Sequence, residues 1–344
     1  MEMRGLLHMQ PRAAPTRNER TAKMQDENRM PRQELSSDDG IDRRGMLQCM
    51  AWVGTGLVWG MTGGMATSRL FGQAPAAKPT FTFAQISDSH LGFARDPNKD
   101  VAATLQKTIA RINALPEPPD FVLHTGDLTH LAKPEEFDAV SELLKEVKAG
   151  KVLYVPGEHD FDGDGNKEYL KRFGKATKGT GWYSFDHKGC HFIGLVNVAN
   201  AKSGSGDGGL GVIGKDQLQW LEKDVAGLKD SNPVVLFAHV PLWMVYEKWG
   251  WGTRDAEQAL KTLKRFGSLT VLNGHIHQVM KKVEGNVTFH TARSTAFPQS
   301  EPGKGSPGPI RDLPAGKLKA ALGLSAVSYT ENRGSLAIVD SALE

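Results

Sequence analysis

Apolar segments that end in polar side chains recur along this chain and constrain its fold more than any other feature. Five polar clusters follow such segments, and every member is an acid or a histidine: Asp88/His90, Asp127, Glu158/His159, His239 and His275/His277. Stretches with helical spacing lie between the apolar segments, as in residues 100–115, where Leu105, Ile109 and Ile112 share one face. Strands that alternate with helices predict a parallel sheet covered by helices.

The expected elements cover most of the chain after residue 80. Strands are expected over 81–86, 121–123, 152–155, 182–185, 190–196, 233–238, 269–273, 279–284, 287–291 and 336–339. Helices are expected over 100–115, 134–147, 215–228 and 253–266. Residues 182–185 and 190–196 should pair without an intervening helix. Residues 298–316 are rich in proline and glycine and should be irregular.

The stretch Gly274-His275-Ile-His277 shows how the polar clusters suggest metal binding. Residues at i and i+2 of an extended segment point the same way, and Gly274 can turn the chain sharply. Two histidines alone are more often core or surface residues than ligands, and an Asp at a strand–helix junction is usually a helix cap. Five such clusters at the carboxyl ends of strands would meet at one sheet edge, which indicates a metal centre.

Composition and charge argue against several other kinds of protein and site. The 344 residues are 39% hydrophobic and 24% charged, as in an ordinary soluble protein. The net charge of +3 gives no argument for specific nucleic-acid binding. Cys49 and Cys190 are the two cysteines, and Cys49 falls in a leader-like segment, so neither a disulfide framework nor a cysteine metal site is expected in the mature chain.

The first 76 residues have the order of an export signal. Residues 1–40 are polar and without periodicity, which predicts disorder. Arg43-Arg44 then precedes a mildly apolar run over 46–65 and the small-residue site Ala74-Pro-Ala76. The run contains Gly, Thr and Gln, so no permanent membrane span is expected. We interpret residues 1–76 as a disordered N-terminus and a twin-arginine-type signal, with export machinery as partner and a periplasmic or otherwise exported mature chain over 77–344. The alternative is a chance Arg-Arg before a short core helix.

The five clusters together resemble the blocks of the calcineurin-like metallophosphoesterases, relatives of the purple acid phosphatases. The blocks read Asp88-Ser-His90, Gly126-Asp127, Gly157-Glu158-His159-Asp160, His239 and Gly274-His275-Ile-His277, in the family's order over about 190 residues. The resemblance implies a four-layer α/β/β/α sandwich with a two-metal site along one edge of its sheets.

The resemblance also implies a role for each matched residue. Asp88, His90 and His277 would hold the first metal, Asp127 would bridge both metals, and Glu158, His239 and His275 would hold the second. His159 would donate a proton or contact phosphate, and Asp160 would orient its ring. Mixed Asp/His ligation suits Mn, Fe or Zn. The expected reaction is attack of a metal-bridging hydroxide on a phosphate mono- or diester, with a small phosphorylated and conceivably nucleotide-like substrate.

Glu158 departs from the family pattern, which has Asn at this position. A third carboxylate would leave two divalent ions with less net positive charge to attract an anionic phosphate. Two arrangements are open: Glu158 ligates the second metal, or its longer side chain swings away and leaves that site weak. The alternative function is therefore a non-catalytic or weakly active metal-bound scaffold or sensor.

Three further features are assigned no ligand role. His124 and His130 flank Asp127 and are interpreted as supporting or surface residues. The acidic run over 160–166 mimics the start of a calcium loop but has Lys171 at the closing position, so it is interpreted as a turn before a helix. The aromatic residues over 243–251 either stack on a substrate ring or pack their loop onto the core.

Overall fold

The computed structural model describes residues 56–62, 65–71, 78–161, 166–199, 209–314, 316–331 and 336–344. The chain divides into two compact units, residues 1–76 and 77–344. In the first unit, strands β1 (Gly56–Thr62) and β2 (Met65–Phe71) pair as an antiparallel hairpin, so these two stretches do not form the short helix of the alternative interpretation. Arg43, Arg44, Ala74-Pro-Ala76 and most of the calcium-loop-like run lie outside the described residues.

The second unit contains two mixed sheets. The five-stranded sheet has the order β13-β12-β3-β4-β5, and the six-stranded sheet has the order β10-β11-β9-β8-β7-β6. The first comprises β3 (Phe81–Ile86), β4 (Phe121–His124), β5 (Val152–Tyr154), β12 (Gly323–Tyr329) and β13 (Leu336–Ala342). The second comprises β6 (Tyr183–His187), β7 (Cys190–Gly194), β8 (Val234–Phe237), β9 (Leu269–Asn273), β10 (Lys281–Glu284) and β11 (Val287–Thr291).

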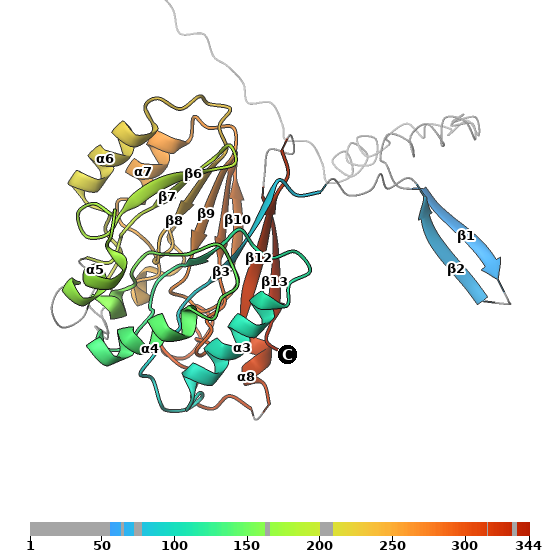
Figure 1. Ribbon diagram of the computed structural model, residues 1–344, viewed down its shortest axis with the longest axis horizontal. Coiled ribbons are helices and arrows are strands. Elements are labelled where there is room, and N and C mark those ends of the chain that lie inside the picture. The colour runs from blue at the N-terminus through green and yellow to red at the C-terminus, as the bar shows by residue number, and fades with distance from the viewer. Residues whose placement is uncertain are drawn as a thin grey trace, which may run out of the picture. The chain divides into compact units, whose positions relative to one another are not determined.

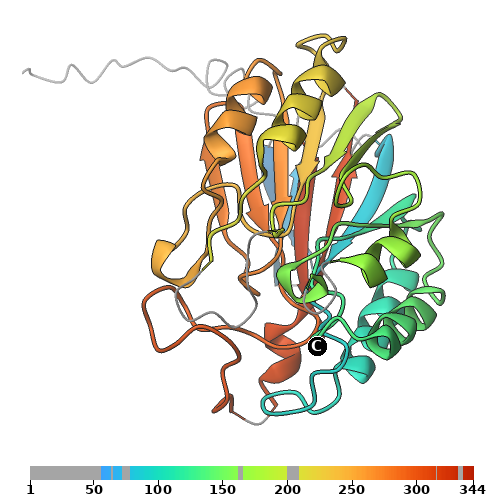
Figure 2. The same cartoon turned by 90° about the vertical axis from the view of Figure 1, so that its left-hand side faces the viewer.

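Helices cover the outer faces of both sheets (Figures 1 and 2). The helices are α3 (Val101–Asn113), α4 (Pro134–Leu144), α5 (Lys167–Phe173), α6 (Lys215–Val225), α7 (Ala256–Leu263) and α8 (Leu318–Ala321), with short 3₁₀ turns η1 (Glu158–Asp160) and η2 (Glu247–Trp249). The Asp100 carboxylate caps α3 by accepting from the Ala103 amide at 2.9 Å, and Pro134 starts α4.

Alternating side chains build three separate cores between these layers. In β3, Phe81 and Phe83 face the other sheet, whereas Ala84 and Ile86 pack beneath α3 and α4. In β8, Phe237 likewise faces between the sheets, while its neighbours on the other face pack under α6 and α7. Three cores between four layers confirm the expected α/β/β/α sandwich.

The structure adds one strand that sequence patterning did not indicate. β12 inserts between β3 and β13 and runs antiparallel to both. Its sequence, Gly-Leu-Ser-Ala-Val-Ser-Tyr, alternates small and polar residues without a clear apolar face, although Leu324 and Ser325 are both buried. Within the described part of the chain, no helix combines the length and apolarity needed to cross a membrane.

Candidate metal centre

The polar clusters converge at the carboxyl ends of the parallel strands. Asp88 and His90 follow β3, Asp127 follows β4, and Glu158 follows β5 in the turn η1. From the other sheet, His239 follows β8, and His275 and His277 follow β9. Two sheets that meet along this edge therefore supply one site from both sides, as strand topology predicts.

One half of the site consists of Asp88, His90 and His277, all of which are buried. His277 Nε2 lies 3.2 Å from Asp88 Oδ1 and 3.3 Å from His90 Nε2. One ligand atom from each residue falls within 4.8 Å of the others, so the three can share one cation.

The other half consists of Glu158, His239 and His275. Glu158 Oε2 lies 2.9 Å from His239 Nε2, and Glu158 Oε1 lies 2.9 Å from His275 Nδ1. The Glu158 side chain therefore points into the cluster, in agreement with the first of the two arrangements considered from sequence.

Asp127 joins the two halves through one oxygen atom. Its Oδ2 lies 3.5 Å from His90 Nε2 in the first half and 3.3 Å from His239 Nε2 in the second. Its Oδ1 accepts a hydrogen bond from the His159 amide at 3.0 Å. A carboxylate between two ligand sets is the arrangement needed to bridge two cations.

Neighbouring histidines keep the Asp88 and Glu158 carboxylates ionised in spite of burial. Burial alone would raise the pKa of Asp88, but His277 and His239 outweigh it and hold that pKa at about 2. Burial also opposes ionisation of Glu158, yet His275 and His239 lower its pKa well below the ordinary value. Burial disfavours the His239 cation as well, but the adjacent carboxylates raise its pKa well above 6.5. Positive charge at this position is therefore strongly favoured.

Several buried atoms at the site make no hydrogen bond. They are Glu158 Oε2, His239 Nε2 and both ring nitrogens of His275. Buried polar atoms are normally paired, and these atoms lie close together without well-directed hydrogen bonds, so the set suits a ligand that accepts lone pairs from oxygen and nitrogen together. A metal cation fits that requirement, because all of these atoms belong to metal-ligand residue types.

The backbone around the site is strained at five of the clustered residues. Positive φ angles occur at Asp88 (55°), His90 (42°), Asp127 (53°), His275 (69°) and His277 (55°). Residues other than glycine adopt this region at a cost of order 1–3 kcal/mol each, and such strain clusters at functional sites. The positive φ angles therefore lower the stability of the fold and at the same time direct these side chains into the site.

The motif glycines are required for space. A Cβ at Gly157 would lie 2.0 Å from Asp127 Oδ1, and a Cβ at Gly274 would lie 2.0 Å from Ser87 Oγ. Gly274 was expected to supply an unusual backbone angle, but the left-handed angles belong to His275 and His277 instead. The absence of a side chain at Gly274 instead allows two strand ends to approach each other closely.

The Asp160 carboxylate is held by neighbouring backbone and side-chain donors. The carboxylate accepts hydrogen bonds from the amides of Gly157, Leu128 and Thr129 and from the Thr129 hydroxyl, at 2.9–3.1 Å. None of these donors is the His159 ring. Burial and the charge of Asp127 raise the pKa of Asp160 to about 7, against these hydrogen bonds. Asp160 therefore positions the backbone of its own motif, Gly157–Asp160, against the segment that follows β4.

The ring of His159 is held by a different group. His159 Nδ1 donates to the backbone carbonyl of His130 at 2.7 Å, and the two imidazoles stack with centroids 4.9 Å apart. Sequence spacing gave no sign of this contact, because His130 was interpreted only as a supporting or surface residue. His124 is buried, and its Nε2 lies 2.7 Å from the Ser89 hydroxyl.

The aromatic loop packs against the core and its own residues. Trp251 is fully buried, Trp243 packs against Phe289 with centroids 5.2 Å apart, and Trp249 lies edge-on to Trp251. These contacts favour the packing role of the loop over a stacking platform.

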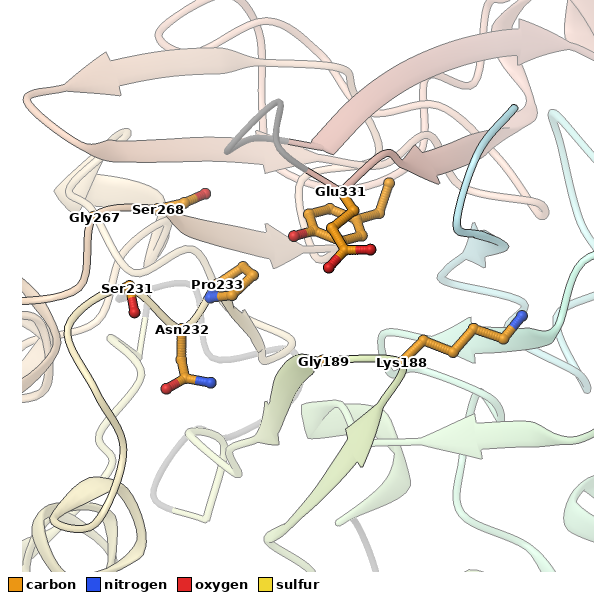
Figure 3. Close-up of a pocket in the computed structure, with 9 residues that line it drawn as sticks. Lys188, Gly189, Ser231, Asn232, Pro233, Gly267, Ser268 and Glu331 are labelled. Atoms are coloured by element: carbon orange, nitrogen blue, oxygen red, sulfur yellow. The ribbon is translucent and has the colours of Figure 1, made fainter. Parts of the chain in front are cut away.

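A separate cavity of about 500 Å³ lies at the opposite ends of the strands (Figure 3). Its lining includes Lys188, Pro233, Ser268 and Glu331. Pro233 directly precedes β8 and Ser268 directly precedes β9, whereas the histidines of the metal centre follow these strands. This cavity is therefore not part of the candidate metal centre.

Comparisons with known proteins agree with this architecture. Residues 81–279 match the family model described as calcineurin-like phosphoesterase. A glycerophosphodiester phosphodiesterase of Enterobacter lignolyticus is 26% identical over 223 residues, which cover 62% of this chain and 76% of that protein. A 3',5'-cyclic-nucleotide phosphodiesterase of a Nostoc species is 25% identical over 226 residues, 64% of this chain and 80% of that protein. A dimetal phosphatase from Danio rerio superposes with a TM-score of 0.59 at 16% identity, over 77% of this chain and 97% of that one.

Proposed function

Because the chain belongs to the calcineurin-like phosphoesterase family, we propose that it is a metal-dependent phosphodiesterase that hydrolyses a small phosphodiester. One observation carries the proposal: Asp127 Oδ2 lies within 3.5 Å of ligand atoms from both halves of the site. The names of the relatives, which act on glycerophosphodiesters and cyclic nucleotides, support a small diester as the substrate class.

The residues that would hold two cations form two sets that share Asp127. Asp88, His90 and His277 would hold one ion, and Glu158, His239 and His275 would hold the other. When bound, two divalent ions would polarise the phosphoryl oxygens and lower the pKa of the attacking water. Their ligand set of carboxylates and imidazoles suits Mn, Fe or Zn.

His159 is the candidate general acid. Its Nδ1 proton is retained by the His130 carbonyl, so Nε2 is the atom that can exchange a proton with substrate. A protonated Nε2 would donate to the leaving oxygen as the ester bond breaks. The hydrogen bond that its backbone N–H donates to Asp127 Oδ1 holds the backbone next to the shared ligand. A general acid of this kind contributes about 10²–10⁴-fold to the rate.

The test is hydrolysis of a bis-aryl phosphate diester and its aryl monoester by the purified protein, with Mn, Fe, Zn or Mg added in turn. We expect metal-dependent hydrolysis of the diester. His159→Ala should lower turnover about 10²–10⁴-fold while the bound metal stays unchanged. Two bound metals without hydrolysis of either ester would support the alternative, in which Glu158 makes the protein a non-catalytic scaffold or sensor.

We also propose that the protein is exported. The support is the order of Arg43-Arg44, an apolar run and Ala74-Pro-Ala76 in the sequence. Cell fractionation should recover a shortened protein outside the cytoplasm, and Arg43→Lys with Arg44→Lys should retain the full-length protein inside. Full-length wild-type protein that stays in the cytoplasm would contradict export.

A further inference from the structure

The Nδ1 atom of His90 has a different kind of partner from the Nδ1 atoms of His239 and His277. His239 Nδ1 and His277 Nδ1 donate to the backbone carbonyls of Thr125 and Phe297, at 2.7 and 2.5 Å. His90 Nδ1 instead faces a side-chain atom, His130 Nδ1, at 3.4 Å. Outer partners of this kind orient a ligating imidazole and set which nitrogen carries its proton.

The fold holds His130 at this place through its backbone. The His130 amide lies 2.9 Å from the Leu91 carbonyl and 3.2 Å from Glu136 Oε2, and the Leu131 amide donates to the same Glu136 oxygen at 2.8 Å. Glu136 is buried in the first turn of α4. The segment after β4 is thus tied both to the segment after β3 and to α4, so the His130 ring is directed at His90.

Hydrogen-bond chemistry then assigns the proton positions. His90 Nε2 points into the site, toward His277 Nε2 and Asp127 Oδ2. To ligate a metal there, Nε2 must present its lone pair, which places the ring proton on Nδ1. The facing atom, His130 Nδ1, must then be an acceptor. A proton on His130 Nδ1 would force the His90 proton onto Nε2 and remove His90 from the ligand set.

We propose that His130 is a positioning residue: its Nδ1 accepts a hydrogen bond from His90 Nδ1 and thereby presents His90 Nε2 to the first metal. The inference rests on the proposed function only in that His90 is a metal ligand. It concerns metal affinity and does not depend on which ester is hydrolysed. With His130 Nδ1 as the acceptor, the proton of the neutral ring is on Nε2, so the 3.5 Å contact of Nε2 with Arg95 Nη2 is between two donors and contributes no hydrogen bond.

A competing explanation is that the His130 ring acts only by packing. It stacks on His159 at 17° between planes and meets Phe93 edge-on, with centroids 5.2 Å apart. Two substitutions separate the roles. His130→Phe keeps an aromatic ring and removes the acceptor, whereas His130→Asn removes the ring and keeps an oxygen acceptor on Cγ, where Nδ1 is attached.

The experiment measures cobalt affinity of the full chain by competition with a chelator, and follows the visible absorption of bound Co²⁺. His130→Phe should weaken binding at one of two sites about 10–100-fold and change the spectrum, while His130→Asn should stay within a few-fold of wild type. The matched control is His187→Phe, because His187 lies on β6 beside Asp120. This substitution should change neither the cobalt affinity nor the spectrum. Circular dichroism checks that every variant is folded.

Each other outcome has a separate meaning. Wild-type affinity in His130→Phe, or equal weakening in both His130 variants, would overturn the positioning role. Loss of a third equivalent of cobalt in both variants would also overturn it, because His130 would then be a ligand itself. Absence of cobalt binding by the wild type would overturn this inference and the proposed function together. Cobalt binding without ester hydrolysis would overturn the proposed function alone.

Discussion

At the scale of single residues, Glu158 decides the charge of the site. Its two oxygens lie 2.9 Å from His239 and His275, and its ionised state is stabilised against burial. With Asp88 and Asp127 it makes three carboxylates in the ligand set. Two divalent ions would then leave one net positive charge to attract an anionic diester, where a neutral amide at this position would leave two.

Glu158→Asn tests this assignment directly. We expect affinity for the second metal to fall roughly 10-fold or more, because a charged ligand is lost. At saturating metal, KM for an anionic diester should fall, because the site gains positive charge. Metal titration and steady-state kinetics measure both.

Glu117→Asn, at an exposed position, is the control and should alter neither quantity. Unchanged metal affinity and unchanged KM in Glu158→Asn would show that Glu158 is not a ligand.

At the scale of elements, the site depends on how closely strand ends approach each other. Gly274 ends β9 against Ser87 and Asp88, which follow β3 in the other sheet. Asp88 in turn accepts from the His275 amide at 3.1 Å. The two sheets are therefore joined at the metal centre through close contacts that leave no room for a side chain at position 274.

Gly274→Ala should damage stability and metal binding together. Its Cβ would lie 2.0 Å from Ser87 Oγ and 2.8 Å from Asp88 Oδ2, and overpacking of this kind costs about 1–3 kcal/mol. Thermal unfolding and cobalt titration give the two readouts. Gly227→Ala is the control, because nothing lies within 4 Å of its Cβ, and its stability should be near that of wild type.

A second substitution makes the steric cause specific. Ser87→Gly in the Gly274→Ala background should recover part of the lost stability, because it removes the closest contact. Strictly additive effects of the two substitutions would contradict the steric explanation.

At the scale of the whole of residues 77–344, a polar network joins the two sheets through β10, β11, β12 and β13. Asp340 on β13 lies 2.9 Å from His290 Nε2 on β11 and 3.0 Å from Lys281 Nζ on β10. The Ser325 hydroxyl on β12 donates to the same carboxylate at 2.7 Å. The five-stranded sheet thus contacts the edge of the six-stranded sheet through one acid.

The network predicts a pH dependence of stability. Burial alone would raise the pKa of Asp340, but His290, Ser325 and Lys281 lower it below 3.8. Because the folded pKa is depressed, the stabilisation is present above pH 3.8 and is lost as pH falls through the folded pKa.

Asp340→Asn should therefore lower Tm at neutral pH, and the difference from wild type should shrink below about pH 4. Thermal unfolding between pH 3 and pH 7 measures this difference. Asp312→Asn, at an exposed position, should show little difference at any pH. A Tm difference that grows as pH falls would contradict the assignment.

The sequence by itself determined the alternation of strands and helices and the residue types that gather at the sheet edge, whereas the four-layer order was implied by the family resemblance. Alternation of strand and helix is a local property, and the carboxyl ends of parallel strands must meet wherever the sheet forms. The sequence therefore predicts that the seven candidate ligands between Asp88 and His277 lie close together. The strand β12 was not predicted, because small and polar residues separate its apolar residues Leu324, Val327 and Tyr329 without a clear alternation.

Only the tertiary structure decided which side chains support these seven. Asp160 accepts hydrogen bonds from backbone amides, and His130 contacts both His159 and His90. Residues 90 and 130 lie 40 positions apart, and their rings meet because of strand pairing and the Glu136 contacts. Contacts of this kind depend on the relative placement of separate elements, which the periodicity of any one segment does not contain.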